Sequence, residues 1–328
     1  SLIFGVLSLF IFIISINYNL YNLFGGMPSL QDLEKPESEL SSELFSSDNK
    51  LLGKYFRYNR SPVKFDELSD ELVTTLLVTE DIRYYDHSGI DLKGLIRASY
   101  GVVKNVATFG SSGLEGGGST ITQQLAKNLF KIRREKKGKL SGVPFLGLVI
   151  SKVKEWIVAV KLEEFYTKKE ILAMYLNTAE YGSNSYGIKV ASKTYFNKLP
   201  SELNYNEASI IVGLLNKPTK YNPYFNPENA LEKRAEIFYN LFKYNVVDKT
   251  TYDSLKVMDL SLNYKVENQN VGQATYFRTV VRNYLINWAK ENGYDLFSDG
   301  LKIYTTIDSR LQDHAEKAVH DQMKRLQS

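Results

Sequence analysis

Apolar residues between Ser69 and about Tyr239 recur mostly at helical spacing, and this regularity is the feature that most restricts the fold. Glycines and prolines interrupt the pattern at intervals, as they do at the ends of helices. Strand-like stretches lie only in the flanks, from Leu51 to Phe65 and from Leu301 to Ile307. The sequence therefore predicts a mainly α fold, with a small β element before it and a mixed α/β region after it.

The segment from Glu80 to Asp91 contains the first candidate catalytic residue. Val73, Leu76 and Leu77 form an apolar helical stripe, and Glu80 is the next position along it. A carboxylate at the end of a buried face is partly removed from water, which suits it to proton transfer. A helix-terminal glutamate turned toward solvent is the alternative that this segment alone leaves open.

A second conspicuous segment, Gly-Gly-Gly-Ser-Thr-Ile-Thr-Gln-Gln-Leu-Ala-Lys, runs from Gly116 to Lys127. Thr120 and Gln123 fit the capping-box pattern, so a helix is predicted to begin there. A helix start preceded by glycines exposes backbone N–H groups, which suit a phosphate or pyrophosphate. Gln123, Gln124 and Lys127 are predicted to share one face of this helix. A capped surface helix with solvated polar residues is the alternative.

Together, these two segments resemble the first two motifs of the peptidoglycan glycosyltransferases (glycosyltransferase family 51). This module occurs in class A penicillin-binding proteins and in monofunctional transglycosylases. The first family motif is Glu-Asp-x-x-Phe-x-x-His-x-Gly, which Glu80 to Gly89 match with a tyrosine in the aromatic place. The second, Gly-Gly-Ser-Thr-Ile-Thr-Gln-Gln-x-x-Lys, is matched in full from Gly117 to Lys127. Segments that look like later motifs extend the resemblance over about residues 28–245.

The helix predicted to begin near Ser151 resembles the third family motif, Arg-Lys-x-x-Glu, with Lys152 and Glu155 in register. Ser151 stands in the place of the arginine, so one phosphate-binding cation of the family pattern is missing. Lys154 and the basic run from Lys131 to Lys139 are candidates to compensate. A lysine and a glutamate three residues apart on a helix are otherwise an ordinary surface ion pair.

The resemblance implies a lysozyme-like, mainly α glycosyltransferase domain that polymerises lipid II into β-1,4-linked glycan strands, inverts the donor anomeric carbon and releases undecaprenyl pyrophosphate. Such chemistry needs a base for the attacking hydroxyl and cations for the departing pyrophosphate. Glu80 is implied as the base, and Glu155 as the catalytic carboxylate on the pyrophosphate side. The residues implied in substrate binding are Asp81, His87, Ser119, Thr120, Gln123, Gln124, Lys127 and Lys152.

The resemblance also limits the cofactors and partners. A divalent cation, Mg²⁺ or Mn²⁺, at the pyrophosphate is the one cofactor that it admits, with Glu155 as the candidate ligand. The implied partners are lipid II, the growing glycan chain, a membrane bilayer, and other proteins of cell-wall synthesis or division. The net charge of +4 is too small to indicate nucleic acid, and the lack of cysteine excludes disulfides and thiolate metal sites.

An apolar run from Leu2 to Ile16 opens the chain. A membrane-spanning helix needs about 20 apolar residues; the run is shorter, but the chain begins on serine rather than methionine. We expect a transmembrane anchor over residues 1–24, with a cleaved signal peptide as the alternative. The basic run and the apolar stretch from Val143 to Ile150 predict a second membrane contact. The resemblance implies a single-pass protein of the bacterial inner (cytoplasmic) membrane with its catalytic domain on the periplasmic side.

These features divide the 328 residues into four parts. Residues 1–24 are the anchor, 25–65 a juxtamembrane linker with the small β element, 66–247 the glycosyltransferase domain, and 248–328 a linker that leads into a transpeptidase region. Gly300 to Asp308 resembles the start of that region in class A penicillin-binding proteins, which indicates the N-terminal part of a larger bifunctional protein.

Two other functions compete with this interpretation. A lysozyme-like hydrolase or lytic transglycosylase also needs a proton-transferring glutamate, but it has no pyrophosphate to bind. A catalytically inactive, membrane-anchored scaffold is favoured only by the departure at Ser151. Ser47 to Lys50 fits the Ser-x-x-Lys and Ser-Asp-Asn patterns of transpeptidases. Its polar surroundings and the lack of a Lys-Thr-Gly segment indicate a chance match.

Overall fold

The computed structural model describes residues 2–34, 41–56, 62–97, 118–130, 132, 138–266 and 273–327. The chain forms two compact units. Unit 1 comprises residues 1–37, 63–179 and 200–261, and unit 2 comprises residues 38–62, 180–199 and 262–328. Helices make up the described elements of unit 1, whereas the sheet belongs to unit 2. The predicted mainly α fold with a small β element is confirmed.

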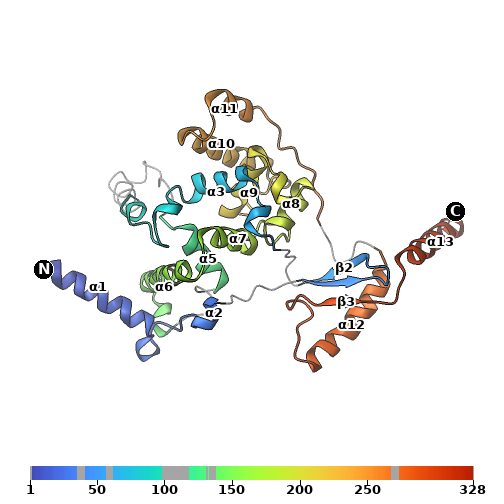
Figure 1. The fold of residues 1–328 in the computed structure, drawn as a ribbon, viewed down its shortest axis with the longest axis horizontal. Helices are drawn as coiled ribbons and strands as arrows, with labels where there is room; N and C mark the ends of the chain where they lie inside the picture. Colours follow the sequence, from blue (N-terminus) through green and yellow to red (C-terminus); the bar gives the residue numbers. More distant parts are fainter. Residues whose placement is uncertain are drawn as a thin grey trace. The chain divides into compact units, whose positions relative to one another are not determined.

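Unit 1 contains two groups of packed helices: α5 with α6 and α7, and α3 with α9 and α10 (Figure 1). Its α-helices are α1 (Leu2–Asn17), α2 (Leu30–Glu34), α3 (Asp70–Glu80), α5 (Ile121–Leu129), α6 (Pro144–Phe165), α7 (Lys168–Thr178), α9 (Tyr205–Asn216), α10 (Pro227–Lys243) and α11 (Lys249–Lys256). Residues 92–97 are also helical. Short 3-10 turns are η1 (Leu20–Asn22), η2 (Phe65–Glu67), η3 (Tyr84–Asp86), η4 (Lys139–Gly142) and η5 (Pro200–Glu202).

Side-chain caps fix where several of these helices begin, α3, α5, α7 and α9 among them. Ser69, Thr120, Thr167 and Asn204 each accept a hydrogen bond from the amide three residues further on. Such a bond satisfies an amide that has no partner inside its helix. The predicted helix start at Thr120 is confirmed, although the Gln123 side chain does not complete the reciprocal half of a capping box and donates to a loop carbonyl instead.

Helix α3 buries one face against α9 and α10, and this face differs from the predicted stripe. Leu76 is buried as predicted, but Val73 and Leu77 are only half-buried. The buried face instead includes Leu72 and Val78, because Val78 packs in an apolar cluster with side chains of α10. The last residue of α3 therefore lies at the rim of this face.

Helix α1 has 16 residues and ends at Asn17. Asn19, Tyr21 and Asn22 then adopt left-handed φ values of 47°, 54° and 57°, so the chain turns directly after the helix. Among the described residues, no helix combines the length and the apolar character needed to cross a membrane. In this respect the structure differs from the transmembrane helix predicted over residues 1–24.

Unit 2 contains a three-stranded sheet in the order β2 (Leu51–Tyr55), β1 (Ser42–Phe45), β3 (Lys302–Tyr304). Strand β1 pairs antiparallel with β2 and parallel with β3. Helix α12 (Thr275–Glu291) covers the sheet (Figure 1), and its Ala289 shares an apolar core with Leu44 and Leu52. Helices α8 (Ile188–Phe196) and α13 (Ser309–Gln327) also belong to this unit.

The first strand of the hairpin lies in residues 42–45, which were predicted as linker, and the hairpin thus begins earlier than the predicted range of 51–65. The strand predicted in Leu301 to Ile307 is confirmed as β3, and with α12 and α13 around it in sequence the C-terminal region is mixed α/β, as predicted. Strand β3 pairs with β1, so the two predicted linker regions, 25–65 and 248–328, contribute to one sheet.

The transpeptidase-like segment Ser47 to Lys50 forms the turn between β1 and β2. The Asp48 carboxylate accepts hydrogen bonds from the Ser309 hydroxyl at 2.6 Å and the Ser309 amide at 2.9 Å. These bonds hold the pKa of Asp48 far below its ordinary value. The segment therefore has a structural role at the start of α13, in agreement with its interpretation as a chance match.

Candidate active site

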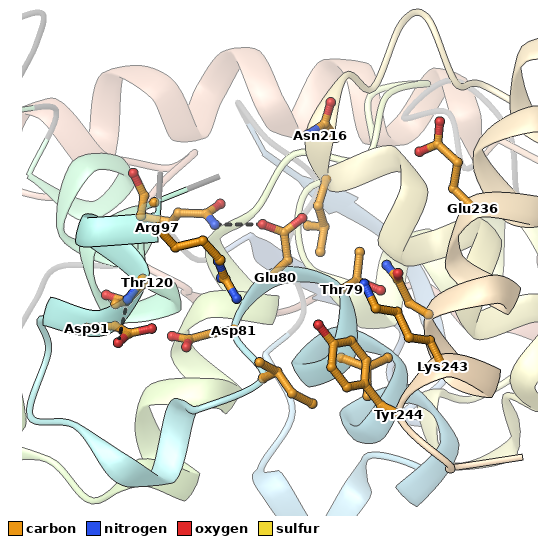
Figure 2. A pocket seen from close by; sticks show the side chains of 18 of the residues that line it. Thr79, Glu80, Asp81, Asp91, Arg97, Thr120, Asn216, Glu236, Lys243 and Tyr244 are labelled. Carbon is orange, nitrogen blue, oxygen red and sulfur yellow. Dashed lines mark hydrogen bonds between the residues drawn. The ribbon is translucent and has the colours of Figure 1, made fainter. Parts of the chain in front are cut away.

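A cavity of about 830 Å³ in unit 1 collects most of the predicted site residues. Figure 2 shows Glu80 between two groups of labelled side chains, with Arg97 and Asp91 on one side and Lys243 and Glu236 on the other. The predicted residues that line the cavity are Glu80, Asp81, Ser119, Thr120, Gln124, Lys127 and Lys152. The other three, His87, Gln123 and Glu155, lie behind the cavity wall and are held by hydrogen bonds within the fold.

Glu80 is the last residue of α3, and its carboxylate is held by a neighbouring amide. The Gln124 Nε2 atom donates to Glu80 Oε2 at 2.7 Å. The Gln124 Oε1 atom in turn accepts from the Tyr175 hydroxyl at 2.9 Å. The Gln124 amide therefore fixes the position of the Glu80 carboxylate at the cavity.

Asp81, from the loop after α3, caps the N-terminal end of helix α5. Its buried carboxylate accepts from the Ile121 amide at 3.1 Å and lies 3.1 Å from the His87 Nε2 atom. The backbone N–H of Gln123 likewise has a partner within the chain, because it donates to the Thr120 hydroxyl at 3.2 Å. The expectation that the start of this helix offers its N–H groups to phosphate is therefore wrong for these two amides. Their partners come from the chain itself.

Gly89 explains why the first motif ends in glycine. Its φ of +84° lies in the left-handed region, and a Cβ atom there would lie 2.8 Å from the backbone of Ala159 in α6. Its carbonyl oxygen accepts from the Thr120 hydroxyl at 2.7 Å and the Gln123 side-chain amide at 3.1 Å. The motif loop is thus clamped between α5 and α6, and the substrate-binding roles predicted for His87 and Gln123 stay predictions.

Lys152 joins the start of α5 to α6. Its Nζ atom lies 2.8 Å from Glu155 Oε2 and donates to the Ser119 hydroxyl at 2.7 Å. The Glu155 side chain is 1% exposed and that of Lys152 is 32% exposed. The buried carboxylate therefore fixes the ammonium group, while the ammonium group faces the cavity. This is not the solvated surface pair that the spacing alone suggests.

Lys154, one of the two candidates to replace the missing arginine, does not line the cavity. Lys154 is buried, and its Nζ atom donates to the carbonyl oxygen of Gly25 at 2.8 Å. It joins α6 to the segment that follows α1. Most of the predicted basic run, Lys131 and residues 133–137, lies outside the described residues, as do Gly116 and Gly117. The side chain at Ser151 donates to the carbonyl oxygen of Gly147 inside α6.

An ion pair stiffens the loop after α3. The Arg83 Nη2 atom pairs with Asp91 Oδ2 at 2.5 Å, and the Gly94 amide donates to Asp91 Oδ1 at 2.9 Å. Burial raises the pKa of Asp91, but these hydrogen bonds outweigh it, so the pKa lies below its ordinary value. Asp91 lines the cavity as a fixed, charged part of its wall.

The opposite side of the cavity was not predicted. Helix α10 contributes Lys233, Glu236, Asn240 and Lys243, and Asn216 ends α9 beside it. These α10 positions follow each other at intervals of three or four residues, beside the buried face that includes Ile237 and Phe238. The polar stripe was visible in the sequence, but without a motif it could not be told from an ordinary solvated face.

The donor set around Glu155 does not form a resident metal site. Its carboxylate is paired with Lys152. Within the described ranges, no three or more histidine, aspartate or glutamate side chains cluster as metal ligands do. The predicted divalent cation therefore finds no complete set of protein ligands there.

Comparison with known proteins identifies the family that this chain resembles. The sequence profile of the family described as "Transglycosylase" matches residues 48–242. Penicillin-binding protein 1A of Escherichia coli (strain K12) is 30% identical over 305 residues, which cover 93% of this chain and 33% of that protein. Penicillin-binding protein 1A of Aquifex aeolicus (strain VF5) is 30% identical over 327 residues, covering 99% of this chain and 42% of that protein. A crystal structure of penicillin-binding protein 1A from Haemophilus influenzae matches at a TM-score of 0.44 and 21% identity, covering 86% of this chain and 29% of that one.

The chain thus spans between a third and about two fifths of the length of these two curated relatives. The family match covers more than half of the chain and includes the whole cavity wall formed by α3, α5 and α6. It confirms the predicted family and the predicted enzyme class. The chain belongs to the transglycosylase family.

Proposed function

We propose that this chain polymerises lipid II into β-1,4-linked glycan strands and releases undecaprenyl pyrophosphate. The observation that carries the proposal is the meeting of Glu80, Lys127 and Lys152 in one cavity. A held carboxylate can remove a proton, and ammonium groups can stabilise the negative charge that develops on a leaving pyrophosphate. A hydrolase acting on finished glycan strands needs no such cations.

In the proposed reaction, the 4-hydroxyl oxygen of the acceptor sugar attacks the anomeric carbon of the lipid-linked donor. The new C–O bond forms as the bond from the anomeric carbon to the pyrophosphate oxygen breaks, and the configuration inverts. Glu80 receives the hydroxyl proton, and the electron pair leaves with the pyrophosphate. Lys127 and Lys152 stabilise that charge, while Glu155 acts indirectly by fixing Lys152.

The same proposal includes a lysozyme-like arrangement of unit 1. Its support is a glutamate at the C-terminal end of a helix that opens into a cavity between two helical groups. In such an arrangement, the base approaches the sugar from the side opposite the pyrophosphate. This leaves room for the attacking hydroxyl, as inverting chemistry requires.

The experiment that tests the function is incubation of the purified chain with fluorescently labelled lipid II in detergent, followed by gel separation. We expect a ladder of long products that muramidase digests to labelled disaccharide units. Absence of polymer from a folded, monodisperse preparation contradicts the proposal. Shortening of added glycan strands, without polymer formation, would instead support the hydrolase alternative.

We also propose that unit 1 contacts a bilayer on the extracytoplasmic side of the cytoplasmic membrane. Phe4 and Phe10 of α1 are 77% and 61% exposed, and Phe145 and Leu148 of α6 are 80% and 52% exposed. The two helices pack together through an apolar cluster that includes Ile16 and Ile150, so their exposed apolar side chains belong to one body. Amphipathic surfaces of this kind bind at the lipid interface.

Flotation with anionic vesicles tests the membrane contact. The full chain should float, and deletion of residues 1–24 should leave weaker, salt-sensitive binding through the α6 end, since basic side chains near such a surface contribute about 1 kcal/mol each. Replacing Phe145 and Leu148 by serine in the deletion variant should remove most of the remaining binding. No binding of the deletion variant at low salt contradicts the second contact.

We propose that any Mg²⁺ or Mn²⁺ enters with the pyrophosphate of the substrate rather than as a resident ion. Magnesium commonly binds through one or two carboxylates together with substrate phosphates. EDTA should then lower turnover on lipid II but leave the melting temperature of the substrate-free protein unchanged. Full turnover in EDTA contradicts the use of a cation, and a lower melting temperature indicates a resident one.

A further inference from the structure

Tyr175 lies outside the cavity but is connected to its base. It belongs to α7, which packs against α5, and its side chain is 1% exposed. Its hydroxyl donates to Gln124 Oε1 at 2.9 Å, and the Nε2 atom of the same amide donates to Glu80 Oε2 at 2.7 Å. Three side chains from three helices thus form a linear series of hydrogen bonds that ends at the candidate base.

The direction of each bond in this series is fixed by chemistry. An ionised carboxylate can only accept, so the amide of Gln124 must turn its NH₂ group toward Glu80. Its oxygen then faces Tyr175, whose hydroxyl must donate. An amide side chain can rotate by half a turn at little steric cost, because its oxygen and nitrogen differ little in size. The hydrogen bond from the Tyr175 hydroxyl lowers the energy of the orientation in which the Gln124 NH₂ group faces Glu80.

The series also distinguishes the two oxygens of Glu80. The amide occupies Oε2, and among the described residues no hydrogen bond is made to Oε1. A proton arriving from a substrate hydroxyl therefore meets Oε1, while Oε2 keeps the carboxylate in place. Such orientation of a base within about half an ångström is worth large factors in rate.

We propose that Tyr175 is a positioning residue for the transglycosylase reaction: it holds the Gln124 amide so that the amide fixes Glu80 with Oε1 toward the acceptor hydroxyl. This inference rests on the proposed function, because it takes Glu80 as the base. Tyr175 does not touch the substrate. Its proposed effect on Glu80 passes through Gln124.

A double-mutant cycle with steady-state kinetics on labelled lipid II tests this dependence. Tyr175→Phe should lower kcat about tenfold and change KM less than about twofold, because the effect lies on the reacting carboxylate and not on binding. Gln124→Met, which removes both hydrogen bonds at similar volume, should lower kcat at least as much. Tyr175→Phe should cause no further loss when Gln124 is already methionine, since coupled residues are not additive.

A structural role for Tyr175 gives a different result. The two single effects on kcat would then multiply in the double variant, and this outcome overturns the proposal, as does wild-type kcat in Tyr175→Phe. If Tyr175→Phe does not fold, Gln124→Asn provides the test. Its amide is one methylene shorter and cannot reach both partners, so it should lower kcat as Gln124→Met does, and wild-type kcat contradicts the series.

Tyr84→Phe is the matched control. Tyr84 is also fully buried, and its hydroxyl donates to the carbonyl oxygen of Lys168 at 2.9 Å, away from Gln124. This variant loses one buried tyrosine hydroxyl but should keep wild-type kcat. Glu80→Gln in the same assay separates the two hypotheses. If Glu80→Gln is inactive and Tyr175→Phe is normal, only the positioning role fails; if Glu80→Gln is active, the base assignment fails.

Discussion

The two sides of the cavity differ in how firmly their polar groups are held. On the side of α3, α5 and α6, Glu80 and Lys152 each have a partner that is almost fully buried, Tyr175 through Gln124 in one case and Glu155 in the other. On the side of α10, Lys233 pairs with Glu236, whose side chain is 57% exposed. Tyr239 on the same side is 53% exposed.

This difference indicates a division of work. Groups that must meet a reacting atom are effective when they are fixed before the substrate arrives, since no reorganisation is then needed during the reaction. Groups that only hold a large, variable substrate can remain mobile and solvated. We therefore interpret the α3–α5–α6 side as the reacting side and the α10 side as a binding surface.

The largest effect is expected at Glu80. Replacement by glutamine keeps the size of the side chain and a hydrogen-bond acceptor for Gln124 but removes the base. Turnover of lipid II should fall by about 10²–10⁴, the usual range for loss of general-base catalysis, with unchanged circular dichroism. Glu236→Gln removes a carboxylate from the opposite side of the same cavity and should lose less than about threefold. Equal losses of turnover in Glu80→Gln and Glu236→Gln would contradict the distinction between a reacting side and a binding side.

Lys152→Ala should have the next largest effect. The ammonium group is held by Glu155 and Ser119 where leaving-group charge is expected to develop. Removing one such fixed donor typically costs about 10²–10³ in kcat, and KM should change much less. The exposed Lys169→Ala on α7 serves as a control for charge alone. Unchanged kcat in Lys152→Ala means that the pyrophosphate is stabilised by other groups.

Asp91→Asn tests whether the reacting side is rigid through its own ion pairs. Asparagine can still accept from Gly94 but loses the charge that pairs with Arg83, so stability at pH 7 should fall by about 1.5–3 kcal/mol. Because the pKa of Asp91 is lowered in the folded protein, its contribution is present above the unfolded value of about 3.9 and is lost as the pH falls through the folded value. Urea unfolding at pH 7 and pH 3 should show a difference between wild type and variant that shrinks at the lower pH. If the stability difference between wild type and variant is the same at both pH values, the lost stability comes from packing and not from the charge of Asp91.

The local motifs predicted the reacting side because its residues follow each other at fixed spacing on three short segments. The pairing of Lys152 with Glu155 is an example, and so is the cap at Thr120. Features made by long-range packing could not be predicted in this way. Tyr175 lies in an apolar helical run, where a tyrosine ordinarily indicates core packing, and only the contact of α7 with α5 brings its hydroxyl to Gln124.

The same limit applies to the fold. Residues 42–45 contain only two apolar side chains among polar neighbours, so the segment did not predict a strand on its own. Its pairing with β3, some 260 positions later in the chain, and the packing of Leu44 against Ala289 of α12 are long-range contacts that define this strand. The end of α1 agrees with the sequence more closely: the apolar run stops at Ile16, and the backbone turns at Asn19 and Tyr21.

Lys243→Ala should have a smaller effect of a different kind. Lys243 lines the α10 side, and its ammonium group lies 5.7 Å from the centre of the Tyr244 ring. A solvated cation of this type contributes at most about 1 kcal/mol, so KM for lipid II should rise about two- to fivefold while kcat stays within twofold. Lys249→Ala on α11, an exposed lysine paired with Asp253, is the control. A large fall in kcat would place Lys243 among the reacting groups.

Ser151→Arg should have the smallest effect, and it tests whether the reacting side already contains the cations it needs. Ser151 does not line the described cavity, and its hydroxyl donates to the carbonyl oxygen of Gly147 within α6. Arginine keeps the helix, because its intrinsic helix propensity is higher than that of serine. Activity should be unchanged or rise by less than about threefold, since a cation added beside solvent gains little. Abolished activity with intact folding by circular dichroism would mean that this helix face has a different arrangement from the family pattern. A rise well above tenfold would mean that the missing arginine limits the reaction, and that Lys127 and Lys152 alone leave the pyrophosphate incompletely stabilised.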